Sequence, residues 1–187
     1  MILPVHIIGS TILRKVAVDI EKDYPDLDIL IDNMFDTMKS SDGVGLAAPQ
    51  IGESIRVFII DASPMSEEEP ELEGLQRTFI NAHIIEKKGD LIQSNEGCLS
   101  IPDIREDVLR YPEITIQYID KNFEEHTEKF EGIAAVIIQH EYDHLDGMLF
   151  TDKVSALRKK FLKRKLSAIA KGNFTKRYKV ILGKKFR

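Results

Sequence analysis

Two histidines four residues apart enclose a glutamate in the segment Gln139-His140-Glu141-Tyr142-Asp143-His144. Positions i and i+4 of an α-helix lie on one face, so both histidines can direct a ring nitrogen at the same metal ion. Glu141 is then close enough to take a proton from a metal-bound water without being a ligand itself. The motif therefore predicts metal-assisted hydrolysis. The alternative is a solvated helix face on which the same pattern arose by chance.

The helix motif supplies only two ligands, whereas a catalytic zinc-type site uses three protein ligands and an open position for water. In one large class of zinc proteases the motif continues to a third histidine, but Phe150 stands at that position here. Another class uses a downstream glutamate, and the chain after His144 contains no Glu, His or Cys. The third ligand is therefore expected upstream, among several carboxylates and four named candidates: His6, His83, His126 and Cys98.

The composition is that of an ordinary globular protein: 187 residues, 43% of them hydrophobic, are enough for one domain with its own core. A single cysteine excludes an intrachain disulfide and fits a reducing compartment, so we expect the cytoplasm. The N-terminal residues lack the pattern of a signal peptide, and no run approaches the roughly 20 apolar residues of a spanning helix. No membrane partner is expected.

Charge is distributed unevenly along the chain. Residues 1–152 contain all 31 acidic residues and 12 basic ones, a formal charge of −19, whereas residues 153–187 contain 14 basic and no acidic residues. The basic segment either packs against the acidic body of its own chain or contacts a polyanion.

Hydrophobic periodicity predicts an α+β fold with antiparallel or mixed sheets around the metal-binding helix. A helix capped by Asp26 is expected from Leu27 to Met38, the metal helix begins at Gly132, and a basic helix runs from Ser155 to about Ala170. Strands are expected at 56–60, 78–85, 111–119, 125–130 and 178–182, the third and fourth as a hairpin with its turn at Asn122. Segment 63–76, with five glutamates, is expected to be a solvated, mobile insertion with too few apolar residues to pack.

Cys98 lies in a glycine-containing turn at the edge of a strand, where a thiolate could be presented to a metal, although a lone cysteine more often fills an apolar core. Three stretches together resemble the motifs of peptide deformylases in order and residue type. They are Gly43-Val44-Gly45-Leu46-Ala47-Ala48-Pro49-Gln50, Glu96-Gly97-Cys98-Leu99-Ser100 and the helix motif 139–144. The resemblance covers residues 1 to about 150. It implies a small α+β fold and hydrolytic removal of the formyl group from the initiator methionine of new polypeptides, with release of formate.

The resemblance also implies roles for individual residues. Cys98, His140 and His144 would hold the metal, and Glu141 would act as general base and then as acid. The Gln50 side-chain amide and the Leu99 backbone N–H would donate to the developing oxyanion. Gly45 would pair with the substrate as an added strand, and Arg105 would stand at the rim. The methionine pocket would be lined by Val44, Ile133, Val136 and Ile137.

The resemblance implies Fe²⁺ as the native metal, while Zn²⁺, Ni²⁺ and Co²⁺ also suit one sulfur and two nitrogen ligands. Residues 1–152 would form the catalytic domain, and residues 153–187 a basic helix and extension, either part of that domain or a tail. The implied partners are the N-formyl-Met nascent peptide and, through the basic segment, the ribosome. Neither DNA nor membrane binding is expected.

In the basic helix, an apolar stripe is expected to dock on the body and leave a cationic face free. The stripe comprises Leu157, Phe161, Leu162, Leu166 and Ile169, and the cationic face Arg158, Lys159, Lys160, Lys163, Arg164 and Lys165. Two other functions remain open. The helix motif alone also fits a zinc peptidase with an aspartate as third ligand. The basic segment fits an inactive fold retained to bind nucleic acid or protein.

Overall fold

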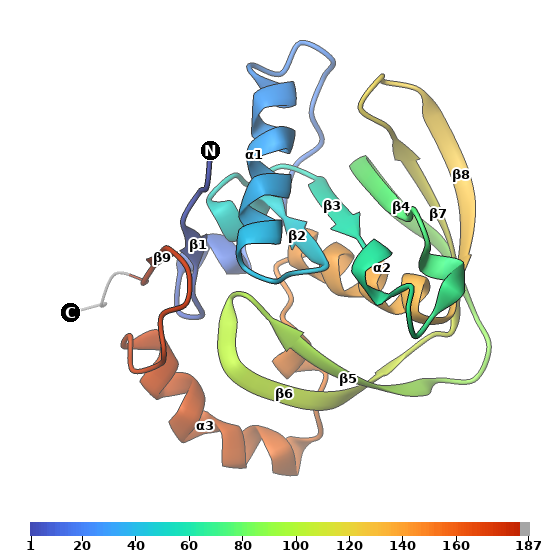
Figure 1. Cartoon of the computed structure of the whole chain (residues 1–187). Coiled ribbons are helices and arrows are strands. Elements are labelled where there is room, and N and C mark those ends of the chain that lie inside the picture. Colours follow the sequence, from blue (N-terminus) through green and yellow to red (C-terminus); the bar gives the residue numbers. More distant parts are fainter. Residues whose placement is uncertain (184–187) are drawn as a thin grey trace.

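The computed structural model describes residues 1–183 (Figure 1). Its helices are α1 (Leu27–Ser40), α2 (Gly132–Leu145) and α3 (Ala156–Ala170). Its strands are β1 (Val5–His6), β2 (Gly45–Ala47), β3 (Val57–Asp61), β4 (Gln76–Lys88), β5 (Ile92–Cys98), β6 (Ile101–Arg110), β7 (Glu113–Ile119), β8 (Glu125–Glu131) and β9 (Val180–Ile181). Short 3₁₀ turns connect several of them, including Ala48–Ile51 and Phe150–Asp152. The predicted α+β class is confirmed.

The main sheet has the strand order β2-β3-β4-β7-β8, with every neighbouring pair antiparallel. Alternate side chains of β7 are buried, Ile114, Ile116 and Tyr118, as the period of a strand with one solvated face requires. The predicted hairpin of β7 and β8 is confirmed by a continuous antiparallel register between Glu113 and Ile119.

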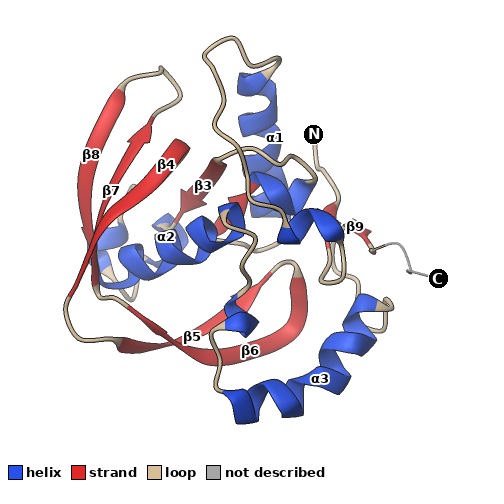
Figure 2. Cartoon of the chain, turned by 180° about the vertical axis from the view of Figure 1, so that it is seen from behind, coloured by secondary structure: helices blue, strands red, loops and turns tan. Residues whose placement is uncertain are grey.

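Helix α2 lies between the main sheet and the antiparallel hairpin of β5 and β6 (Figures 1 and 2). Toward the sheet it contributes Ala134, Ala135 and Ile138 to a core that contains Phe79 and Ile116. Toward the hairpin it presents polar side chains. The helix is buried along almost its whole length, from Ala134 to Leu145 with Tyr142 half-buried, because it is covered on both sides.

The two ends of the described chain meet in a small parallel sheet of β1 and β9 (Figure 1). Helix α3 covers β6, and Leu162 and Ile169 share a hydrophobic cluster with Ile7, Ile104 and Val108. The strand expected at 178–182 is therefore confirmed at Val180–Ile181. Residues 184–187 of the basic segment lie outside the described residues. The helices within residues 1–183 are too short or too polar to cross a lipid bilayer.

The acidic segment 63–76 packs better than its composition suggests, so the expectation that it could not pack is wrong. Leu72 is 1% exposed and belongs to the main core, with Met65 and Leu75 packed against it. Two short 3₁₀ turns, Ser63–Met65 and Pro70–Leu72, bring these side chains to one side. These three apolar side chains are enough to hold the segment against the core, while four of its five glutamates are exposed.

Two helix predictions were right in position and wrong in detail. Asp26 precedes α1 but has a left-handed backbone (φ 53°), and its side chain makes no capping hydrogen bond. In α3 the apolar stripe is incomplete, because Leu157 and Phe161 are 63% and 67% exposed. Arg158, expected on the free cationic face, instead donates from Nε to Glu106 Oε2 at 2.8 Å.

The hairpin of β5 and β6 has no counterpart among the predicted strands. On β6 the inward-facing positions are Ile104, Glu106, Val108 and Arg110, all of them buried. Two of these four residues are charged, so the alternation of apolar and polar residues that marks a half-buried strand is broken. Glu106 pairs with Arg158 of α3, and Arg110 pairs with Glu96 and Asp143. These partners lie on other elements, so the local sequence pattern cannot reveal them.

Candidate metal centre

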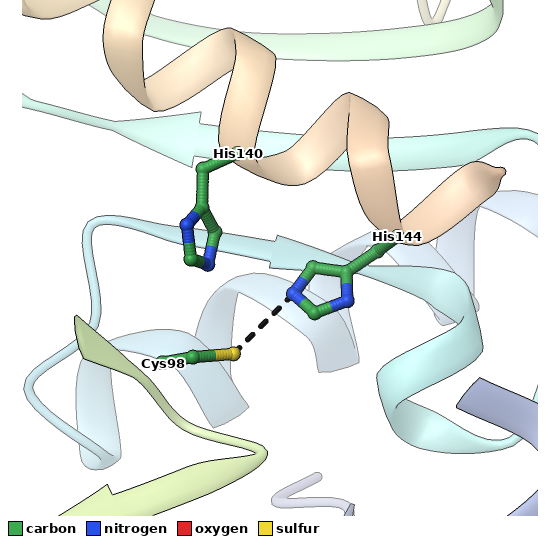
Figure 3. Close-up of side chains that lie close together, drawn as sticks. All are labelled: Cys98, His140 and His144. Carbon is green, nitrogen blue, oxygen red and sulfur yellow. Dashed lines mark hydrogen bonds between the residues drawn. The ribbon is translucent and has the colours of Figure 1, made fainter. Parts of the chain in front are cut away.

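Three side chains from two elements converge between α2 and the end of β5 (Figure 3). His140 and His144 project from one face of α2, and Cys98 ends β5. Cys98 Sγ lies 3.3 Å from His144 Nε2, and one ligand atom from each of the three residues lies within 4.8 Å of the others. A tetrahedral divalent ion with one sulfur and two nitrogen ligands separates its donors by roughly 3.5 Å. The donor set and spacing fit such an ion.

The other upstream candidates are engaged elsewhere. His83 Nε2 lies 3.6 Å from Asp19, His126 Nε2 lies 3.1 Å from Asp120, and His6 stands beside Gly52. The two aspartates downstream of the motif form ion pairs with arginines, Asp146 with Arg56 at 2.9 Å and Asp152 with Arg14. These ion pairs disfavour an aspartate as third ligand, and Cys98 is the upstream candidate whose sulfur lies near both histidines.

A buried ion-pair network holds the Nδ1 side of the His140 ring. His140 Nδ1 donates to Glu96 Oε2 at 2.7 Å, and Arg110 binds both oxygens of the same carboxylate at 2.6 and 2.8 Å. Arg110, only 2% exposed, also donates to Asp143 at 2.6 Å. Burial alone would raise the pKa of Glu96, but the hydrogen bonds from Arg110 and His140 outweigh it and lower the pKa to about 2. The carboxylate stays ionised and occupies Nδ1, so Nε2 is the ring nitrogen of His140 that can bind a metal.

The two histidines differ in their electrostatic surroundings. Burial lowers the pKa of His144 well below its usual value, and the charge of His140 adds to the effect, so His144 is a neutral imidazole as ligation requires. Burial also acts to lower the pKa of His140, but hydrogen bonds to Cys98 and Glu96 reverse it and raise the pKa. The Glu96 carboxylate and the Cys98 sulfur therefore favour positive charge on this imidazole.

Glu141 lies beside the three candidate ligands and is almost completely buried. It is 5% exposed, and its Oε2 has no hydrogen-bond partner among the described residues. Burial raises the pKa of Glu141 to about 7. A Cβ added at Gly45 would lie 2.5 Å from Glu141 Oε1, so only glycine allows β2 to pass this closely. A carboxyl with a pKa near neutrality suits proton transfer in both directions.

Gln50 is fixed in orientation within the short turn after β2. Its Oε1 accepts a hydrogen bond of 2.8 Å from the backbone N–H of Ala47, which leaves Nε2 as the free donor end. Nε2 lies 3.2 Å from Ser100 Oγ and 3.5 Å from Cys98 Sγ. The amide therefore points its N–H groups at the turn that carries Cys98 and Leu99.

A cavity of about 910 Å³ opens onto these residues. Its size falls within the range of small-molecule and peptide side-chain sites. Eleven of the twelve residues singled out from the sequence line it, and His144 lies behind the wall, 1% exposed. The eleven are Val44, Gly45, Gln50, Cys98, Leu99, Arg105, Ile133, Val136, Ile137, His140 and Glu141.

The structure adds residues that the sequence did not single out. Glu96 lies inside one of the quoted motifs, yet its function as the partner of His140 depends on Arg110, which comes from the unpredicted strand β6. Thr175, Arg177 and Tyr178 reach the cavity from the segment between α3 and β9. Nothing in their local sequence indicates a functional role, since contacts with distant segments, among them the pairing of β9 with β1, bring them there.

Comparison with known proteins identifies the family of this chain. Residues 2–160 match the family model described as polypeptide deformylase. A curated peptide deformylase of Christiangramia forsetii is 51% identical, with 96% of this chain and 95% of that protein aligned. A second, of Flavobacterium psychrophilum, is 49% identical over the full length of both.

Solved structures show the same fold. The crystal structure of a peptide deformylase from Legionella pneumophila superposes with a TM-score of 0.81 at 34% identity, covering 94% of this chain and 99% of that one. The enzyme from Thermotoga maritima gives 0.75 at 35% identity, covering 83% and 99%. The chain belongs to the peptide deformylase family, metal-dependent hydrolases that remove the N-formyl group from newly synthesised polypeptides.

Proposed function

We propose that Cys98, His140 and His144 hold the catalytic metal ion of this protein and that Glu141, Gln50 and Leu99 carry out the chemistry beside it. The observation that supports this assignment is the convergence of the three ligand atoms within 4.8 Å on the wall of a cavity that also contains Glu141. When bound there, a divalent ion polarises the formyl carbonyl and lowers the pKa of the attacking water.

Ferrous iron is the native ion in this proposal, because the family resemblance implies it. The sulfur and imidazole donors also suit Zn²⁺, Ni²⁺ and Co²⁺, any of which can occupy the same three ligands. A thiolate donates more negative charge than a third imidazole would, so the ion is a weaker Lewis acid and the hydrogen-bond donors around the formyl oxygen matter more.

Glu141 moves the proton. Its carboxylate accepts the proton that the attacking water loses and returns it to the nitrogen of the leaving amine. The unpartnered Oε2 and a pKa of about 7 support this use, because such a group accepts and releases a proton with little cost at neutral pH.

Gln50 and Leu99 stabilise the negative charge that develops on the formyl oxygen. The Gln50 amide is pre-oriented by the Ala47 N–H, so its Nε2 donates without first having to reorganise. The backbone N–H of Leu99 is the second donor, adjacent in sequence to the metal ligand Cys98. Donors held in place before reaction are worth more than mobile ones.

The rest of the cavity binds the formyl-methionine end of the substrate. Val44, Ile133, Val136 and Ile137 surround the methionine side chain, and the backbone at Gly45 pairs with the peptide as an added strand. Arg105 stands at the rim, where hydrogen bonds to the side chain and backbone carbonyl of Asn95 hold its guanidinium.

Residues 1–152 carry the catalytic site in this proposal, and residues 153–183 form part of the same domain. The hydrophobic cluster that joins Leu162 and Ile169 to Ile7 and Ile104 supports the inclusion of residues 153–183 in that domain.

The exposed cations of α3, Lys159, Lys160, Lys163 and Arg164, offer a surface for ribosomal RNA near the emerging nascent chain. DNA and membranes are not partners in this proposal. The compartment is the cytoplasm, where formylated nascent chains are made and a lone thiol stays reduced.

The test is formate release from a formyl-Met peptide by protein purified without oxygen, with bound metal measured on the same sample. Iron at about one ion per chain with turnover is expected, and Glu141→Gln should retain iron while losing turnover. A ferrous thiolate site is vulnerable to oxidation, so activity should decay in air and persist after loading with Ni²⁺. Equal lifetimes of the two forms would contradict iron, and metal without formate release would contradict the activity.

A further inference from the structure

The turn between β5 and β6 carries both Cys98 and Leu99, and three distant segments hold it. The register of the hairpin shifts between Gly97 and Cys98, so the turn is not held by regular strand pairing alone. Gln50 Nε2 donates to Ser100 Oγ at 3.2 Å, and the backbone N–H of Ile8 donates to the Ser100 carbonyl at 2.9 Å. The third contact is a hydrogen bond of 2.6 Å from the Tyr178 hydroxyl to the Leu99 carbonyl.

The position of Tyr178 is set by the parallel pairing of the chain ends (Figure 1). Val5 N–H donates to the Lys179 carbonyl at 2.9 Å, and Val5 is paired with Val180. Just before this strand, the backbone N–H of Thr175 donates to Asp103 on β6 at 3.3 Å. The segment between these two anchors lines the cavity through Thr175, Arg177 and Tyr178. It lies beyond residues 2–160, the part of the chain that the family model matches.

We propose that Tyr178 is a positioning residue for deformylation, whose hydroxyl holds the Leu99 carbonyl and thereby orients the backbone that presents the Leu99 N–H. This inference rests on the proposed function, in which that N–H stabilises the oxyanion. The carbonyl and the N–H of Leu99 belong to consecutive peptide planes that share one Cα, so fixing the carbonyl restricts the rotation of the N–H. A displacement of about 0.5 Å is enough to weaken such a donor.

The surroundings of Tyr178 keep its hydroxyl a donor. Burial raises the pKa of the phenol above its usual value, and the nearby sulfur of Cys98 acts in the same direction. The Tyr178 hydroxyl binds the carbonyl of Leu99, the residue after Cys98, although Tyr178 lies 80 residues after Cys98 in the sequence. The C-terminal segment is therefore part of the catalytic cavity and not only a carrier of positive charge.

The test is Tyr178→Phe in the full-length Ni²⁺-loaded protein, which deletes one oxygen and keeps the ring. We expect kcat for formyl-Met peptide to fall about 5- to 10-fold, the loss typical of one hydrogen bond, while KM changes less than about twofold and metal content is unchanged. Hydrogen exchange at the amides of residues 98–100 should become faster, a change that a remote structural contact would not cause. Tyr24→Phe is the matched control, because the Tyr24 hydroxyl contacts Glu53 at the surface at 3.3 Å.

A second variant keeps the donor. Replacement of Tyr178 by 4-aminophenylalanine retains an N–H at the same end of the ring, and it should preserve kcat within about twofold and restore slow exchange at residues 98–100. Unchanged kcat and exchange in Tyr178→Phe would overturn the proposal. So would a rise in KM alone, a loss of metal, or an amino variant as slow as the phenylalanine one. A wild-type protein without formate release would instead refute the proposed function, and the exchange measurement would still decide whether Tyr178 orders Leu99.

Discussion

Nδ1 of His140 donates a hydrogen bond of 2.7 Å to Oε2 of Glu96, a carboxylate buried between α2 and the hairpin of β5 and β6. The same carboxylate is bound by Arg110, so the imidazole is oriented by an ion pair that never reaches solvent. A metal-binding histidine held in this way keeps one tautomer and one ring orientation.

Arg110→Ala should lower both stability and metal affinity. It leaves the buried Glu96 carboxylate without its cation and Asp143 with only Lys153, at 3.2 Å, and breaking a buried pair in this way costs about 3–5 kcal/mol. Urea unfolding of the metal-free protein measures the loss. Metal affinity, measured by competition with a chelator, should fall about 10- to 100-fold because His140 is no longer held. The exposed Arg77 provides the control, since Arg77→Ala should change stability by less than about 0.5 kcal/mol. Equal losses in both variants would contradict the prediction.

Replacing any of the three ligands should remove metal and activity together. Cys98→Ala, His140→Ala and His144→Ala each leave two donors, too few for a stable site. Metal content after dialysis and formate release should fall in parallel in all three variants. Full retention of metal in Cys98→Ala would reopen the identity of the third ligand.

Glu141→Gln should separate metal binding from catalysis. The amide fills the same space beside Gly45 but cannot accept a proton. Bound metal should be unchanged, and kcat should fall by about 10²–10⁴-fold, the range for loss of a general acid–base group. The comparison is with the ligand variants, which lose both properties. Loss of metal from Glu141→Gln would mean that this carboxylate is itself a ligand.

Gln50→Ala should reduce kcat more than it raises KM. Removing one oxyanion donor typically lowers kcat by about 10²–10³-fold, because the contact forms fully only in the transition state. Steady-state kinetics on formyl-Met peptides measure both constants. If the change is confined to KM, Gln50 binds the substrate without stabilising the oxyanion.

The exposed cations of α3 should govern ribosome binding and leave peptide hydrolysis alone. Changing Lys159, Lys160, Lys163 and Arg164 to Gln should reduce cosedimentation with ribosomes. Wild-type binding should weaken steeply with salt, with log K falling about 0.7–0.9 per contact per decade. The control changes four exposed lysines elsewhere to Gln: Lys15, Lys22, Lys87 and Lys121. Both variants should hydrolyse free formyl-Met peptide normally. Equal binding by the two variants would show that α3 is only a structural element.

The sequence by itself determined the local parts of this protein. His140 and His144 are four residues apart on one helix, so their common direction follows from helix geometry without further information. The hairpin of β7 and β8, helix α1 and the helix that begins at Gly132 were likewise predicted, because the period of apolar residues encodes which face of a single element is buried. The residues alone left the third ligand open among several candidates. Resemblance to a family was needed to select Cys98.

The tertiary structure decided what depends on contacts between distant segments. Cys98 and His144 are 46 residues apart in sequence and meet only because β5 and β6 fold over α2. The inward-facing Arg110 reads as a polar residue on a surface until Glu96 and Asp143 are placed around it. The sequence predicts a solvated segment around Leu72, which is buried, and a buried stripe containing Leu157, which is exposed. Periodicity reports the environment along one element, whereas the energy of a buried charge or an anchoring side chain depends on partners that long-range pairing brings together.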